Sequence, residues 1–168
     1  MTEQTRTMGF FALVRTGTSQ SVQAAISNGA DVNARNSYDK TPLMEAAEYN
    51  QHPEVITALL AAGADIKARD ILGGTALMLA AENNQNAEVI STLLKAGADT
   101  NARIKDGMTA LMEAAMYNQN PEVITTLLAA GADTKAKGNA RKTAFNYAQT
   151  RAKLKGTDAY RQLQEASQ

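Results

Sequence analysis

The sequence predicts an all-α solenoid of helix–turn–helix repeats that are joined by short β-hairpin-like connections. Three motifs recur with a common 34-residue period, and such a period is typical of stacked repeats rather than of a globular domain. The motifs are Gly-Ala-Asp at Gly29, Gly63, Gly97 and Gly131, Thr-(Pro/Ala)-Leu-Met at Thr41, Thr75 and Thr109, and Glu-Val-Ile at Glu54, Glu88 and Glu122. We therefore expect three full repeats, at residues 41–74, 75–108 and 109–142, within one domain that covers residues 1–168.

The first helix of each repeat follows the threonine motif. Thr41 is a good N-cap, and Pro42 is tolerated in the first helical turn because its missing N–H would have no partner there. Leu43, Ala46 and Ala47 then follow at helical spacing, and the small alanines allow a neighbouring helix to approach closely. We expect this helix to end near Asn50, in a left-handed conformation that asparagine tolerates.

The second helix begins at Pro53 and presents the apolar residues of Val55-Ile56 and Leu59-Leu60 as one stripe. Gly63 is placed to end it as a left-handed C′ residue. The residues from there to Gly74 are predicted to form an extended connection with a turn at its tip. Neither helix can bury its apolar stripe alone, so the repeats have to stack on one another.

Different residues at the two ends predict capping repeats, at about residues 8–40 and at 143–168. Phe10 and Phe11 replace smaller residues and can close the core, while Gly17 ends the first helix. The last helix, from Thr157 to Ala166, is more polar than its counterparts, as an outer face requires. The chain is therefore expected to be complete, with three full repeats between two caps.

These motifs resemble the ankyrin family, whose usual repeat reads Thr-Pro-Leu-His-x-Ala-Ala, a Gly-His turn, Val-Val-x-Leu-Leu and Gly-Ala-Asp-Val-Asn-Ala. The resemblance covers roughly residues 8 to 166. The tetratricopeptide family shares the 34-residue period, but its helices follow one another through tight turns without an extended hairpin. The present sequence differs from the usual ankyrin pattern by one extra turn residue, which leaves Asn86 and Asn120 as N-caps, and by methionine in place of histidine at Met44, Met78 and Met112. Both departures suggest bacterial-style repeats.

No residues suitable for catalysis, for a metal ion or for a cofactor stand out. The chain has no cysteine, and its one histidine, His52, occupies a turn position where the other repeats have asparagine. The recurring acids have structural roles, because Glu54 and its equivalents lie in a first helical turn and the aspartates of Gly-Ala-Asp can accept backbone N–H bonds. Glu45 and Glu113 are two repeats apart, too far for joint acid–base chemistry. We therefore expect no enzyme activity.

The charge balance argues against a nucleic-acid-binding protein, and the hydropathy argues against a membrane protein. Lys and Arg number 17, as do Asp and Glu, and no basic block offers a surface for nucleic acid. Neither a signal peptide nor an apolar stretch of about 18 residues is present, so we expect a monomeric cytoplasmic protein without a membrane contact. Secretion by a non-classical route is the alternative location.

The ankyrin resemblance implies that a protein partner docks on the concave side, on the hairpin tips and the first helices. Positions there vary between the repeats, and several are apolar or aromatic, as interface anchors are. The predicted partner-binding residues are Tyr38, Lys40, Glu48, Tyr49, Ile71, Leu72, Glu82, Met108, Met116 and Tyr117.

The same residues are compatible with alternatives to partner binding. Tyr49 and Tyr117 can equally pack across the turn between the helices. The close similarity of the middle repeats also fits an engineered or consensus-derived scaffold without a natural partner, although irregular positions such as Ile104 and Gly138 favour natural divergence. An accessory or regulatory subunit of an enzyme is a further alternative.

Overall fold

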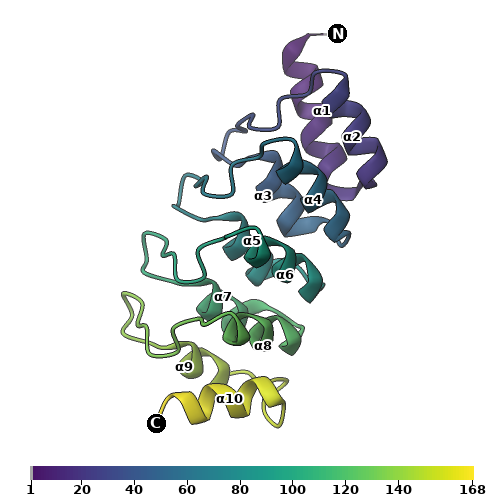
Figure 1. The fold of residues 1–168 in the computed structure, drawn as a ribbon. Coiled ribbons are helices and arrows are strands. Elements are labelled where there is room, and N and C mark those ends of the chain that lie inside the picture. Colours follow the sequence, from purple (N-terminus) through teal and green to yellow (C-terminus); the bar gives the residue numbers. More distant parts are fainter. Residues whose placement is uncertain (1) are drawn as a thin grey trace.

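A computed structural model describes residues 2–168, which form ten α-helices and no β-strand. The helices are arranged in five antiparallel pairs that stack in sequence order, with a long connection between one pair and the next (Figure 1). The pairs are α1 (Glu3–Thr16) with α2 (Ser19–Ser27), α3 (Pro42–Tyr49) with α4 (Pro53–Ala61), α5 (Ala76–Asn83) with α6 (Ala87–Lys95), α7 (Ala110–Tyr117) with α8 (Pro121–Ala129), and α9 (Ala144–Gln149) with α10 (Asp158–Ala166).

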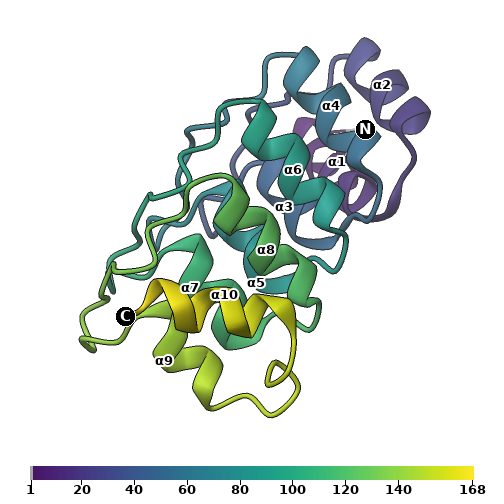
Figure 2. The ribbon, with the colours of Figure 1, turned by 60° about the horizontal axis from the view of Figure 1, so that its bottom comes forward.

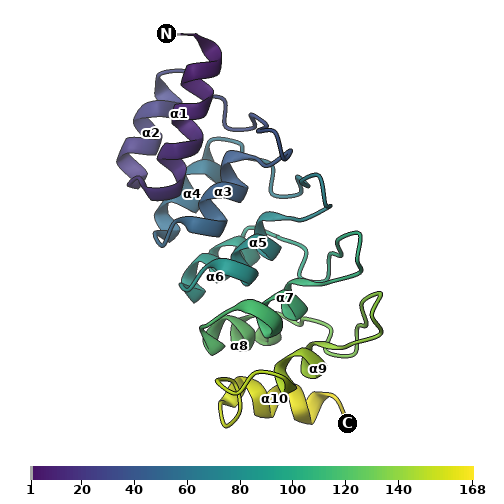
Figure 3. The same cartoon turned by 180° about the vertical axis from the view of Figure 1, so that it is seen from behind.

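The solenoid consists of three parallel rows. The odd-numbered helices pack against each other in one row, and the even-numbered helices pack in a second (Figure 2). The connections form the third row and project to the same side of the stack in each repeat (Figure 3). The predicted all-α repeat fold is therefore confirmed, and the hairpin-like connections are turns that contain no strand within residues 2–168.

The helix ends follow the predicted local chemistry. The side chains of Thr41, Thr75 and Thr109 each accept the backbone N–H of the methionine three residues later. Asn86 and Asn120 also cap their helices through their side chains, whereas His52 makes no capping bond. Each of the four Gly-Ala-Asp glycines has a positive φ, between 81° and 93°, which is a conformation that favours glycine.

Two helix ends differ from the expected ones. The first helix begins at Glu3, ahead of the expected start of the N-terminal repeat near residue 8, because Thr2 caps it by accepting the N–H of Thr5. Asn50 is extended, with φ of −83° and ψ of 129°, so the expected left-handed conformation is wrong. Its side chain is needed for contacts with the preceding helix pair, which are described below.

One apolar cluster runs through the stack from Phe10 in α1 to Leu163 in α10. The paired alanines of the first helices are fully buried, which lets successive helices lie close together. Met44, Met78 and Met112 are buried in the same cluster, where their flexible apolar side chains fill space.

Candidate functional site

Buried asparagines join each of the three full repeats to the helix pair before it. Asn84 Nδ2 donates to the carbonyl oxygens of Ala47 and Asn50, both at 2.8 Å, and its Oδ1 accepts the N–H of Asn86 at 2.9 Å. Asn118 repeats this pattern one unit later, and Asn50 makes equivalent bonds to Val14 and Gly17. We call Asn50, Asn84 and Asn118 the asparagine ladder. It satisfies carbonyl groups at the C-terminal ends of the first helices, which have no partner within the helix.

Arginines hold the connections in a fixed row. Arg69 Nη1 donates to Gly73 O, at 2.8 Å, within its own hairpin, and to Arg103 O, at 2.9 Å, in the next repeat. Arg35 and Arg103 bond in the same way, and the three form what we call the arginine ladder. Neither ladder was predicted from the sequence, although the residues of each recur with the repeat period.

The tips of the connections also pair through their backbones. Ile71 N–H donates to Tyr38 O at 3.1 Å, and Lys105 N–H donates to Leu72 O at 3.2 Å. The tips therefore form one continuous row that is held by hydrogen bonds within the chain.

Large apolar side chains are exposed on this row, as expected from the sequence. Tyr38, Ile71 and Leu72 are 65%, 55% and 62% exposed, although burial of such side chains is favourable. The first helices add three more, Tyr49 on α3 and Met116 and Tyr117 on α7. With Met8 on α1, these are the exposed large apolar side chains of residues 2–168, and all seven lie on a tip or a first helix. We call this surface the hairpin-side face.

Two of the predicted binding residues are largely buried. Met108 is 9% exposed, because it lies at the base of its hairpin and packs in the apolar cluster. Glu48 is 8% exposed, and its Oε2 forms an ion pair with Lys40 Nζ at 2.6 Å. Because Glu48 is buried, removal of Lys40 alone would leave an uncompensated charge, which is costly.

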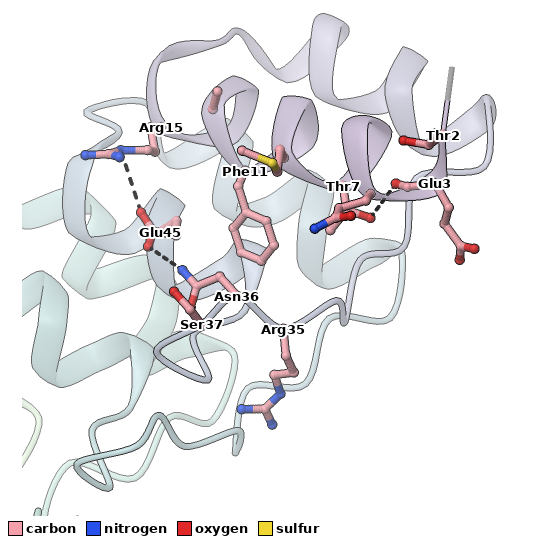
Figure 4. Close-up of a pocket in the computed structure, with 12 residues that line it drawn as sticks. Thr2, Glu3, Thr7, Phe11, Arg15, Arg35, Asn36, Ser37 and Glu45 are labelled. Atoms are coloured by element: carbon pink, nitrogen blue, oxygen red, sulfur yellow. Dashed lines mark hydrogen bonds and ion pairs between the residues drawn. The ribbon is translucent and has the colours of Figure 1, made fainter.

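A second ion pair lies at the N-terminal end of the hairpin-side face. Arg15 Nε approaches Glu45 Oε2 at 3.6 Å, and Asn36 Nδ2 donates to Glu45 Oε1 at 3.2 Å (Figure 4). The guanidinium of Arg15 also stacks on Tyr49, 4.1 Å from the ring centre. Arg15, Asn36 and Glu45 border a groove of about 950 Å³ between α1 and the first hairpin, which Met8 and Phe11 also line.

Glu82 and Glu113, farther along the hairpin-side face, form no ion pair within residues 2–168. Glu113 is 8% exposed, and its side chain makes neither a hydrogen bond nor an ion pair with any residue in 2–168. Burial raises its pKa from 4.5 to about 7, with further contributions from the negative charges of Glu82 and Asp106. Burial also raises the pKa of the half-buried Glu82, as does the charge of Glu48. Glu113 was not among the binding residues predicted from the sequence.

Glu113 lines a cleft of about 370 Å³ between the third full repeat and the C-terminal pair. The walls are formed by apolar, aromatic and acidic side chains from α7, α9 and two adjacent hairpins. They include Ile104, Asp106, Met108, Met116, Tyr117, Asn139 and Tyr147.

The described part of the chain offers neither a metal site nor a membrane span. Across residues 2–168, no three His, Asp or Glu side chains are grouped closely enough to hold a metal ion. None of the helices in this range has the length and hydropathy to cross a bilayer.

Comparison with known proteins agrees with the architecture. A family model described as ankyrin repeats, in three copies, matches residues 3–70 and again residues 52–138. No curated protein matches the chain. Because the two matches together span most of its length, the chain belongs to the ankyrin repeat family.

Proposed function

We propose that the protein is a non-catalytic scaffold that binds a protein partner on its hairpin-side face. Ankyrin repeats are generally modules of protein–protein interaction, and the chain belongs to that family. The observation that carries the proposal is the placement of the exposed large apolar side chains. All seven lie on hairpin tips or first helices, and the second helices carry none within residues 2–168.

The chemistry of these side chains suits a protein interface. Tyrosines combine a large apolar body with a hydroxyl group, and apolar anchors such as Ile71 and Leu72 gain most when a partner covers them. Exposed apolar residues that gather on one face are less common than scattered ones. The balanced charge of the chain favours a protein over a nucleic acid as the partner.

The order of the tip row further supports binding. Backbone bonds between successive tips and the arginine ladder fix the row before a partner arrives. A preordered surface loses little conformational entropy on association, so more of the contact energy contributes to affinity.

The decisive experiment removes the apolar tips without disturbing the core. In the variant, Tyr38, Ile71 and Leu72 are each changed to Ser, and all three are exposed in the wild type. A matched control replaces three exposed residues of the second helices, Ala61→Ser, Lys95→Ser and Ala129→Ser. Each tagged protein is used to capture proteins from a lysate of its source cells, and the captured proteins are quantified by mass spectrometry.

A specific partner should be retained by the wild type and the control and should be depleted about tenfold or more with the tip variant. The partner is then purified, and its affinity is measured by calorimetry. Equal capture by the tip variant and the wild type, with unchanged circular dichroism, would refute binding through the tips.

A further inference from the structure

The N-terminal end of the hairpin-side face shows how this fold binds a guanidinium group. Arg15 is held between the carboxylate of Glu45 and the ring of Tyr49, at 3.6 Å and 4.1 Å. An arginine fits such a site well, because its planar group can pair with a carboxylate and stack on an aromatic ring at once.

The same carboxylate and ring recur two repeats later. Glu113 and Tyr117 stand two full repeat periods after Glu45 and Tyr49. The bonds of the asparagine ladder show which residue of the later repeats is equivalent to Arg15.

Asn50 bonds to Val14 and Gly17 of the first helix pair, and Asn84 makes the equivalent bonds to Ala47 and Asn50 of the second. Val14 therefore corresponds to Ala47 and Gly17 to Asn50, so equivalent positions of α1 and α3 are 33 residues apart. The offset is one short of the repeat period because the turn after α1 lacks one residue. Arg15 therefore corresponds to Glu48, and one period later to Glu82.

The second site thus has its cation replaced by another acid. Glu82 stands where Arg15 would be, and its charge acts on both Glu113 and Tyr117. Asn36, which donates to Glu45, is replaced by the apolar Ile104. Lys142 is the repeat equivalent of Lys40. Its Nζ lies 5.6 Å from the centre of the Tyr147 ring and makes no ion pair with Glu113.

Glu113 is therefore a largely covered residue that has neither a hydrogen-bond partner nor an ion-pair partner among residues 2–168, and it lines an open cleft. Asp106 adds a third negative charge, and Tyr117 and Tyr147 provide aromatic walls. The carboxylate oxygens of Glu113 keep contact with solvent through the cleft, so a cation that enters from outside can reach them.

We propose that the cleft at Glu113 and Tyr117 is a pocket for an arginine side chain of the protein partner, held by a carboxylate and an aromatic ring as Arg15 is, but on the α9 side of α7 and not on the side of the preceding helix. This inference rests on the proposed function only in assigning the arginine to a partner protein. Negative charge in the cleft, the aromatic walls and the internal example of Arg15 all favour a guanidinium group.

The test uses the full chain and a small probe, N-acetylarginine methylamide, with the neutral N-acetylcitrulline methylamide as its isosteric control. NMR signals of the Met116 methyl group and the Tyr117 ring are followed during titration at pH 8 and constant ionic strength. We expect saturable shifts with the arginine probe, with a dissociation constant in the millimolar range, and none with citrulline. The Met8 methyl group, at the other end of the hairpin-side face, should not respond.

Two variants examine the mechanism. Glu113→Gln should weaken binding of the arginine probe roughly tenfold, whereas Glu122→Gln, on the exposed first turn of α8, should leave it unchanged. Glu82→Arg restores a cation at the position of Arg15. It should lower the pKa of Glu113 below that of the wild type, as read from its carboxyl carbon, and should abolish probe binding.

Three results would overturn the inference: equal shifts with citrulline, unchanged affinity in Glu113→Gln, or equivalent shifts with calcium chloride, which would indicate a general cation site. Failure of the pocket can be distinguished from failure of the proposed function, because the probe titration needs no partner protein. Arginine binding without partner capture would refute the proposed function alone, and partner capture without arginine binding would refute the pocket alone.

Discussion

Replacement of Asn84 by Ala tests whether the asparagine ladder holds successive repeats together. The side chain is fully buried and makes three hydrogen bonds, to Ala47 O, Asn50 O and Asn86 N. The substitution leaves two buried carbonyl groups and one N–H group without these partners. Alanine itself fits the extended backbone at this position, so the loss reflects the hydrogen bonds and not backbone strain.

The magnitude follows from the number of bonds. Each buried hydrogen bond contributes a net ~1 kcal/mol, and a buried polar group left unpaired costs about 1–3 kcal/mol. Water that enters the space left by the amide group compensates in part. We therefore expect the free energy of unfolding to fall by about 3 kcal/mol, a large part of the ~5–15 kcal/mol typical of a domain.

Urea unfolding followed by circular dichroism measures this loss. Gln85→Ala is a matched control, because the neighbouring side chain is exposed, and its effect should stay within about 0.5 kcal/mol. Asn118→Ala, which removes equivalent bonds one repeat later, should resemble Asn84→Ala. A loss below about 1 kcal/mol for Asn84→Ala would refute the assigned role of the ladder.

Three further predictions concern single positions. Gly97→Ala should destabilise the fold by about 1 kcal/mol in urea melts, because φ is +90° there while the added Cβ meets no atom within 4 Å; an unchanged midpoint would mean that the backbone is not strained. The raised pKa of Glu113 should make the free energy of unfolding fall as the pH rises from 4.5 to about 7, by at most ~3 kcal/mol, since the unfolded chain ionises first. Glu113→Gln should remove this fall, and identical pH profiles for the variant and the wild type would contradict it. Lys40→Met should cost about 3 kcal/mol by leaving Glu48 unpaired, and the double variant with Glu48→Gln should recover most of that loss; thermal melts that show no recovery would exclude the ion pair as the cause.

Features that depend on a short stretch of chain were predictable from the sequence. The threonine caps and the left-handed glycines act within a few residues of themselves, and their recurrence in every repeat removed ambiguity. The exposure of Ile71 and Leu72 was also predicted, because a hairpin tip has few neighbours that could cover it.

Features that depend on contacts between repeats were missed. The sequence around Asn50 predicts only a local helix end, but the Asn50 side chain reaches back to Val14 and Gly17 in the preceding helix pair. The burial of Met108 and Glu48 likewise depends on the neighbouring repeat. The role proposed for Glu113 depends on Glu82 standing where Arg15 stands in the first repeat. The turn after α1 is one residue shorter than the others, so the 34-residue period does not align Arg15 with Glu82.

The asparagine ladder has a consequence for how such a protein can change in length. Each rung joins a repeat to the main-chain carbonyl groups of its predecessor, so the contact depends little on the identity of the preceding side chains. Excision of residues 75–108 would bring Asn118 to the carbonyl groups of Ala47 and Asn50, which Asn84 now occupies. Gene duplication or deletion in steps of one 34-residue unit can therefore lengthen or shorten the protein while keeping the asparagine bonds at each junction between full repeats.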